Sequence, residues 1–472
     1  MNCLRPNLYY SFLILGALLL CGSQVRAERQ VKELPRGQTI ERVVCHHDAA
    51  QSYALFLPTN YTSNKKWPII YSFDPGARGR VPVELFKTAA EKYGYIVVGS
   101  NNSRNGIPIR NIIETLWADT HERFSIDGKR VYASGFSGGA RVAIIFGYAY
   151  EDAVAGVIAC SGGFPQSVTP TKEMPFVLFG TTGTDDFNFP EMKNLKRTLN
   201  TLGVANRLVV FNGGHIWLPE AVCTEAIEWL ELQAMRIGRV VKNESFIEKS
   251  LTESLAKARA AEVAQEFYNA YTMYADLAAD FKGLADVSDF EKKATALKNS
   301  KEVRDYLKRE KSLEDKQAVL AQQFDRIIAT LNNLSERTDA FADLKIRIGE
   351  LRKKSEAPQD SDERKLARRT LQGLLVGSFE QASNLSAQKK YAAAATLFEV
   401  ATEIKPDNAD LLYSLASARA ASGDKAKALD ALAKALANGF TDFTRIEQDE
   451  NFSALRQNTR FGKIINSARD KK

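Results

Sequence analysis

Two kinds of hydrophobic pattern divide this chain near residue 238. Before that point, short apolar runs that suit buried strands alternate with longer segments that suit helices. Beyond it, strand-like runs vanish and apolar residues recur at steps of three and four. The pattern predicts an α/β domain over residues 38–238, with a mostly parallel, doubly wound sheet, followed by an all-α region.

The first half yields seven strands and five helices. The predicted strands are Tyr53–Leu57, Pro68–Phe73, Tyr95–Gly99, Val131–Gly135, Gly156–Cys160, Pro175–Gly180 and Arg207–Phe211. The predicted helices are Val83–Tyr93, Ile109–Arg123, Ala140–Tyr150, Glu191–Leu202 and Pro219–Ala234. In such a sheet, functional side chains gather beyond the carboxyl ends of the strands.

The second half divides into a helical region over 245–360 and a repeat-like region over 361–472. Breaks are expected at Gly283 and at 356–362. Three apolar stripes mark the buried faces of packed helices: Val263, Phe267, Tyr271, Tyr274, Leu277, Phe281 and Leu284; Leu320, Phe324, Ile327, Leu331 and Leu334; and Phe341, Leu344, Ile348 and Leu351.

The last hundred residues contain a repeat. Ala394, Phe398 and Ala401 recur thirty-four residues later as alanine, leucine and alanine, a period that resembles tetratricopeptide repeats. Because two units are too few for a stable array, we expect the helices over 245–375 to extend the stack. A segment from Asn438 onward resembles a terminal cap. The resemblance implies a concave surface for a protein or peptide partner, or for docking against the catalytic domain.

Residues 1–27 have the pattern of a secretory leader. Arg5 supplies the positive start, Phe12–Leu20 the apolar stretch, and Val25–Ala27 the cleavage site. The apolar stretch is too short to cross a membrane as a helix. A lipid anchor on Cys21 is less favoured, because Leu20 stands where a small residue is needed. We expect an exported protein, periplasmic or secreted, with no stable membrane insertion after cleavage.

Composition bears on nucleic-acid binding, on disulfides and on metal binding. A net charge of +7 on 472 residues is too mild to indicate nucleic-acid binding. Beyond the leader, Cys45, Cys160 and Cys223 allow at most one disulfide, and Cys160 falls in a strand-like run. Four histidines without cysteine or histidine spacing of a zinc site predict no metal.

A nucleophile elbow is predicted at 135–139, which reads Gly-Phe-Ser-Gly-Gly between a strand and a helix. Gly135 and Gly139 allow the strand and the helix to approach closely, and the sharp turn exposes the hydroxyl of Ser137. The amide of Gly138, at the helix start, is a candidate oxyanion donor.

An acid and a histidine follow later strands in the order expected for the α/β-hydrolase fold. His215 is the candidate base. Asp186 is favoured over Asp185 as the acid that orients His215, because Asp186 stands at the aspartate position of a G-x-x-D-x-x-x-P loop. Helix capping by either aspartate, or a surface position for His215, is the alternative. His121 is predicted at the opposite edge of the sheet, and His46 and His47 on the surface.

The loop after Phe73 is expected to supply a second oxyanion donor. Pro75 has no N–H, so Gly76 or Ala77 must donate. Arg78 could reach an acidic substrate group, although a salt bridge to Asp74 is at least as favoured. Three further residues are candidates to line the pocket: Asn101, Asn102 and Trp217.

These motifs resemble α/β-hydrolases of the compact esterase type, near dienelactone hydrolases, polyhydroxybutyrate depolymerases and feruloyl esterases. The resemblance covers residues 65–235 and rests on the segments at 135–139, 183–190 and 213–217. It implies ester hydrolysis through an acyl-serine, without metal or organic cofactor. Short connections leave no insertion for a lid, so we expect an open site for bulky or polymer-attached esters. A serine peptidase on the same fold and an inactive binding scaffold are the alternatives, although no triad residue is missing.

Overall fold

The computed structural model describes residues 34–331 and 337–470. The predicted leader at 1–27 and Leu334 of the second helical stripe lie outside the described residues. Arg36–Lys472 form one compact unit. Among the described residues, helices that could cross a membrane by length and apolarity are absent.

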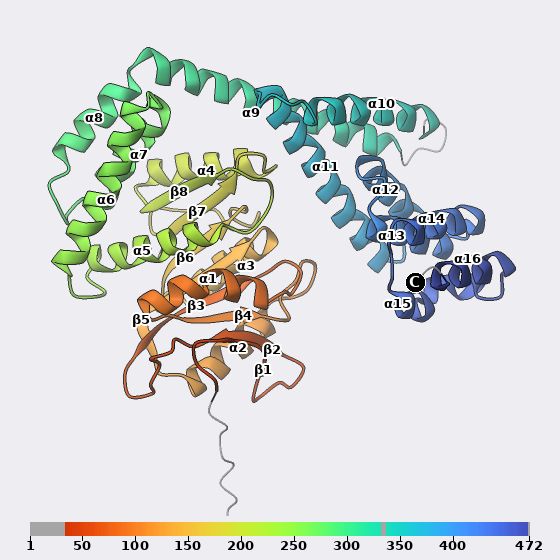
Figure 1. Cartoon of the computed structure of the whole chain (residues 1–472), viewed down its shortest axis with the longest axis horizontal. Coiled ribbons are helices and arrows are strands. Elements are labelled where there is room, and N and C mark those ends of the chain that lie inside the picture. Colours follow the sequence, from red (N-terminus) through yellow and green to blue (C-terminus); the bar gives the residue numbers. More distant parts are fainter. Residues whose placement is uncertain (1–33, 332–336, 471–472) are drawn as a thin grey trace, which may run out of the picture. The chain divides into compact units, whose positions relative to one another are not determined.

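An eight-stranded sheet in the order β1-β2-β4-β3-β5-β6-β7-β8 forms the first half of the chain (Figure 1). From β3 to β8 neighbouring strands run parallel, whereas β1 and β2 are antiparallel to their neighbours. The strands are β1 (Thr39–Val44), β2 (Ser52–Phe56), β3 (Trp67–Phe73), β4 (Ile96–Ser100), β5 (Ile126–Phe136), β6 (Val154–Cys160), β7 (Val177–Gly183) and β8 (Asn206–Phe211).

All seven predicted strands are confirmed, and β1 was missed. β3, β6 and β7 are buried along their whole length, which explains why they read as continuous apolar runs. β1 is an edge strand with exposed Glu41 and Arg42 and an irregular register between Ile40 and Val43. Such a strand lacks the apolar run on which the prediction depends.

Helices cover both faces of the sheet. They are α1 (Arg80–Tyr93), α2 (Arg110–Arg123), α3 (Gly138–Ala149), α4 (Phe189–Leu202) and α5 (Glu220–Arg236), and they confirm the five predicted helices. α1 and α5 pack against each other over one face. On the other face, Trp117 of α2 packs against Phe146 of α3, and Arg141 of α3 pairs with Glu191 of α4.

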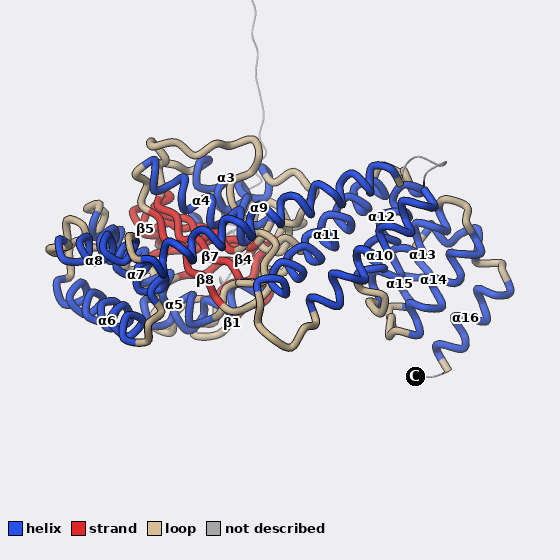
Figure 2. The backbone as a smooth tube through the Cα atoms, turned by 90° about the horizontal axis from the view of Figure 1, so that it is seen from above, coloured by secondary structure: helices blue, strands red, loops and turns tan. Residues whose placement is uncertain are grey.

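The rest of the described chain is helical (Figure 2). Its helices are α6 (Glu244–Val263), α7 (Phe267–Asp280), α8 (Ser288–Lys298), α9 (Lys301–Thr330), α10 (Arg337–Ser355), α11 (Asp362–Ala387), α12 (Tyr391–Ile404), α13 (Ala409–Ala421), α14 (Lys425–Ala437), α15 (Phe443–Gln448) and α16 (Thr459–Arg469). Side-chain caps begin several of them, including Asn243 for α6 and Ser361 for α11.

Two expectations about the helical half are corrected. Val263 is 84 % exposed, because the first stripe is split by a turn between α6 and α7. Of the helices expected to extend the repeat stack, α6–α8 do not, because they share a core with Leu232 and Met235 of α5, whereas α9–α11 share a core with Val400 and Ile404 of α12. The repeat helices α12–α14 instead pack in a core with the end of α11 and with α16.

Candidate active site

Ser137 occupies a strained turn between β5 and α3. Its backbone has φ 54° and ψ −119°, a conformation that non-glycine residues rarely adopt, and its N–H donates to the carbonyl of Cys160 at 2.8 Å. A Cβ on Gly135 would lie 2.0 Å from the carbonyl oxygen of Gly139, and one on Gly139 would lie 2.0 Å from that of Phe73. Glycine is therefore required at both positions for the helix to start so close to the sheet.

The structure places Asp186, rather than Asp185, against His215. The Asp186 Oδ1 to His215 Nδ1 distance is 2.9 Å, and the same oxygen accepts the N–H of Asn188 at 2.8 Å. Asp186 is fully buried, whereas Asp185 forms an ion pair with Arg368. The two acids are adjacent in the chain but serve different partners.

Two aromatic rings hold the imidazole of His215. The ring centroids of Phe136 and Phe187 lie 4.6 and 4.4 Å from it, and the side chain is 8 % exposed. Because Phe136 immediately precedes Ser137, this contact brings the histidine to the elbow. The Ser137 hydroxyl makes no hydrogen bond with any described residue, so both of its lone pairs and its proton are available to a reactant.

The oxyanion donors are only partly as expected. The amide of Gly138 opens α3 and has no acceptor among the described residues. The two amides predicted as second donors are occupied: Gly76 donates to Asp74 Oδ1 at 2.8 Å and Ala77 to the Asp74 carbonyl at 3.1 Å. The prediction of a free second donor at Gly76 or Ala77 is thereby corrected, because the loop folds back on its own aspartate.

Asp74 organises the loop after β3. This fully buried carboxylate accepts from Arg78 at 2.8 and 2.9 Å and from the indole N–H of Trp217 at 2.8 Å. Burial raises the pKa of Asp74, but hydrogen bonds from Arg78, Trp217 and Gly76 outweigh burial and hold it below the usual value. The salt bridge of Arg78 to Asp74, predicted as at least as favoured as a substrate contact, is confirmed within this loop. Trp217, predicted as a substrate contact, instead joins the loop to the segment that carries His215.

Asn101 and Asn102 are also committed to the structure. Asn102 accepts the N–H of Ser52 at 2.9 Å and donates to the carbonyl of Ala50 at 3.1 Å. Asn101 donates to the carbonyl of Glu41 at 3.1 Å. Both amides fasten β1 and β2 to the end of β4, and their place in a substrate pocket stays a prediction.

Helix α11 contacts the two loops that carry Asp186 and His215. Arg368 pairs with Asp185 at 2.8 Å, and Arg369 donates to the Thr184 carbonyl at 2.8 and 2.5 Å. The amide of Gln372, oriented to satisfy both neighbours, donates to the Asp185 carbonyl and accepts the N–H of His215, each at 3.2 Å. Backbone polar groups of both loops therefore depend on a helix about 180 residues away in the chain.

The same helix reaches the opposite side of the elbow. Glu380 accepts a hydrogen bond of 2.7 Å from Asn105, whose side chain packs so closely on Gly138 that a Cβ there would lie 1.9 Å from Asn105 Oδ1. The expectation of an open site is corrected: α11 crosses the rim from His215 to Asn105. The cover comes from the helical half rather than from an insertion in the sheet half, where its absence was noted.

Sequence reasoning missed the contacts of α11 and the bond of Trp217 to Asp74. The salt bridge of Asp74 with Arg78 could be predicted from their spacing, but Trp217 was assigned to substrate. The α11 residues carried no signal, because Arg and Gln on a helix are ordinary surface residues. The remaining histidines lie outside the site: His46 and His47 are exposed, as predicted, and His121 stacks on Trp117. Cys45, Cys160 and Cys223 are buried free thiols.

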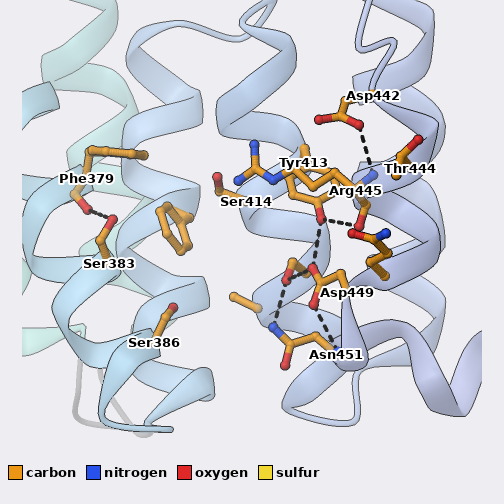
Figure 3. Close-up of a pocket in the computed structure, with 14 residues that line it drawn as sticks. Phe379, Ser383, Ser386, Tyr413, Ser414, Asp442, Thr444, Arg445, Asp449 and Asn451 are labelled. Atoms are coloured by element: carbon orange, nitrogen blue, oxygen red, sulfur yellow. Dashed lines mark hydrogen bonds between the residues drawn. The ribbon is translucent and has the colours of Figure 1, made fainter. Parts of the chain in front are cut away.

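A hollow lies in the repeat region, away from the candidate active site (Figure 3). It has a volume of about 580 Å³ and is lined by α11, α12, α13 and α15. The guanidinium of Arg445 lies 4.5 Å from the ring centroid of Tyr413, and Asp449 accepts from Tyr413 at 2.8 Å and from Ser417 at 2.7 Å. This network makes the wall polar and ordered.

The sheet half has the α/β-hydrolase fold. Its strand order and the chain order of elbow serine, acid and histidine establish the assignment. The tetratricopeptide-repeat family matches residues 385–448. No curated protein matches the chain.

Several solved structures resemble the sheet half. A ferulic acid esterase is 16 % identical, with 41 % of this chain and 97 % of that chain covered and a TM-score of 0.36. An S-formylglutathione hydrolase from Staphylococcus aureus is also 16 % identical (42 % and 99 % covered, TM-score 0.34). An esterase from Pyrobaculum calidifontis is 13 % identical (42 % and 86 % covered, TM-score 0.34).

Proposed function

We propose that this chain is an exported serine hydrolase that cleaves carboxylic esters through an acyl intermediate on Ser137. The observation that carries the proposal is the 2.9 Å pair of Asp186 and His215 beside a serine in an elbow conformation. A carboxylate on Nδ1 leaves Nε2 of the imidazole as the base, which is the arrangement that activates a serine hydroxyl.

The reaction would proceed in two halves. His215 takes the proton of Ser137 as Oγ attacks the ester carbonyl carbon, and the amide of Gly138 stabilises the resulting oxyanion. The tetrahedral intermediate breaks its bond to the alkoxide, which leaves with the proton from His215. Water then attacks the acyl-serine and gives one proton to His215. As this second tetrahedral intermediate breaks its bond to Ser137 Oγ, His215 returns the proton to that oxygen, which releases the carboxylic acid and free Ser137.

The first experiment measures hydrolysis of p-nitrophenyl acetate by the full mature chain and by Ser137→Ala. We expect the substitution to lower kcat by roughly 10³-fold or more. The exposed Ser453, far along the chain, gives a matched control: Ser453→Ala should retain full activity. A fluorophosphonate should label the unsubstituted chain and Ser453→Ala but not Ser137→Ala. Equal turnover by the unsubstituted chain and Ser137→Ala would reject the proposal.

Two alternatives have their own readouts. A serine peptidase on the same fold would hydrolyse amino-acid anilides at a rate comparable with the ester. An inactive scaffold would neither turn over an ester nor take the label. Export is tested by N-terminal sequencing of the mature protein, which should begin at Glu28.

The cover by α11 supports a proposal about substrate size. A helix that touches the His215 loop and Asn105 leaves less room above Ser137 than an open rim does. We therefore expect p-nitrophenyl acetate to be cleaved faster than the same acyl group attached to an insoluble polymer. The hollow of Figure 3 is the proposed contact surface for a protein or peptide partner.

A further inference from the structure

The free edge of β8 borders a cavity that ester hydrolysis does not use. β8 is the last strand of the sheet and pairs only with β7. A cavity of about 560 Å³ lies between this edge and α7, and residues of α4, α5, α6, α8 and α9 also line it. Figure 1 shows α7 beside β8. Four consecutive residues of the strand, 207–210, line the cavity.

The pairing with β7 decides which backbone groups of β8 face this cavity. The carbonyls of Ala205 and Phe211 accept hydrogen bonds from the β7 side at 3.1 and 2.9 Å. Because successive residues of a strand direct their N–H and C=O groups to opposite sides, odd-numbered residues bond β7. Leu208 and Val210 therefore present their N–H and C=O groups to the cavity, where no described residue bonds them. An unpaired edge of this kind is a template for another strand.

Positive charge exceeds negative charge along the cavity wall. Six cations and two carboxylates line it: Lys193, Lys196, Arg197, Arg207, Lys257, Lys298, Glu225 and Asp276. Lys196, Arg197 and Arg207 form ion pairs with carboxylates on α5, α7 and α9.

The other three lysines form no ion pair with a described residue. Lys193 donates to the hydroxyl of Tyr268, and Glu310 of α9 offsets its charge in part. Lys257 and Lys298 are exposed and line the cavity. An incoming chain would therefore meet three lysines at this edge that form no ion pair with a described residue.

The wall opposite β8 suits the side chains of an extended segment. Tyr268, Tyr271, Met273 and Leu277 of α7 line it. Aromatic and thioether side chains give apolar contact without fixing one sequence. Backbone pairing on one side and side-chain pockets on the other are the two requirements for binding a peptide as an added strand.

We propose that the free edge of β8 binds an acidic, extended segment of a partner protein, which joins the sheet as a ninth strand. A second copy of this chain is a poorer occupant, because symmetric pairing of two β8 edges would bring their unpaired lysines together. The proposal is independent of the ester chemistry, since Leu208 and Val210 take no part in it.

The first test uses a labelled octapeptide of alternating glutamate and valine and measures fluorescence anisotropy with the full chain. We expect saturable binding. A lysine–valine octapeptide should bind at least tenfold more weakly, because it meets like charges. A third peptide is the glutamate–valine octapeptide with N-methyl groups on alternate residues, along the peptide edge that would pair with β8. It should also bind at least tenfold more weakly, because its methylated nitrogens cannot donate hydrogen bonds to β8. Equal binding by the methylated peptide, or competition by inorganic phosphate, would show a simple anion site and overturn the proposal.

The second test changes the protein. Val210→Pro removes an N–H that faces the cavity and leaves the bonds to β7 in place, so peptide binding should weaken at least tenfold. Val210→Thr is the matched control and should bind within twofold. Should circular dichroism show that the proline variant does not fold, the double variant Lys257→Glu, Lys298→Glu replaces it, with Lys425→Glu, Lys434→Glu on α14 as its control. Sedimentation tests whether a second copy binds the edge instead. That assignment would follow if the unsubstituted chain is a dimer, Val210→Thr is also a dimer, and the charge-reversed variant dimerises more tightly.

Discussion

The helical half meets the sheet half at several places, and two of these contacts differ in kind. At the candidate active site, α11 donates to and accepts from the backbone of the Asp186 and His215 loops directly. At the edge strand β8, an ion pair of Arg207 with Asp280 joins the strand to α7, and an ion pair of Lys196 with Asp276 joins α4 to α7 beside the same cavity. Direct backbone contacts restrict loops, whereas long side chains can span a gap and leave the strand edge free.

The buried ion pair at β8 differs energetically from the contacts of α11. Asp280 is 4 % exposed, lies 2.8 Å from Arg207 and accepts the indole N–H of Trp229 at 2.7 Å. Burial, opposed in part by Arg207, raises the pKa of Asp280 to about 6. Desolvation therefore outweighs pairing for this carboxylate, as is common for buried charges.

The largest expected effect is the pH dependence of this pair. Because the pKa of Asp280 is higher in the folded chain than its usual 3.8, the folded chain binds the proton more tightly. The stability that the protonated Asp280 contributes is therefore fully present below about pH 4. It is lost as the pH rises through about 6, and the free energy of unfolding falls by up to about 3 kcal/mol. Urea unfolding of the unsubstituted chain and of Asp280→Asn across pH 4–7 measures this: the difference in unfolding free energy should change over that range. Parallel curves would contradict the assignment.

The next prediction asks whether α11 positions the loops that carry Asp186 and His215. Removing both backbone contacts with Arg369→Ala, Gln372→Ala should lower kcat for p-nitrophenyl acetate by roughly 10²-fold and change KM by less than about threefold, since small misplacement of catalytic groups slows the chemistry. Gln381→Ala, an exposed change on the same helix, is the control and should leave both constants unchanged. A rise in KM with constant kcat would make α11 a substrate wall rather than a positioning element.

The smallest effect concerns the partly exposed pair of Arg368 and Asp185. Arg368→Asp and Asp185→Arg should each lower kcat by roughly three- to tenfold, because the side chains are 37 % and 18 % exposed and the pair is worth about 1 kcal/mol. The double variant restores the pair in reverse and should recover most of the activity. Additive losses in the double variant would show that the two charges act separately.

Much of the sheet half could be predicted because its parallel strands are buried on both faces. β6 and β7 are continuous apolar runs, and the glycines around Ser137 predict the turn between β5 and α3. β1 escaped prediction because an edge strand can expose polar residues such as Glu41 and Arg42. Val263 was misplaced because helical spacing continues across the turn that separates α6 from α7.

The candidate site was predictable where local order carries information and not where distant contacts decide. The order of Ser137, Asp186 and His215, each beyond a strand, follows from the alternation of strands and helices. The sequence allows the amides of Gly76 and Ala77 as oxyanion donors, but in the folded chain both amides donate to Asp74 instead. Trp217 resembles a substrate contact in the sequence, but its indole binds this carboxylate, whereas the salt bridge of Arg78 to Asp74 could be predicted from their four-residue spacing.

The sequence by itself determined the two-part architecture, the elbow and the order of its candidate triad, because burial periodicity and glycine requirements are local properties of the chain. Only the tertiary structure decided that α11 covers the rim, that Asp185 faces Arg368 while Asp186 faces His215, and that the edge of β8 stays unpaired. These outcomes depend on contacts between segments that are 150 or more residues apart in the sequence. A pattern of hydrophobic positions shows that one face of an element is buried, but it does not show which other element covers that face.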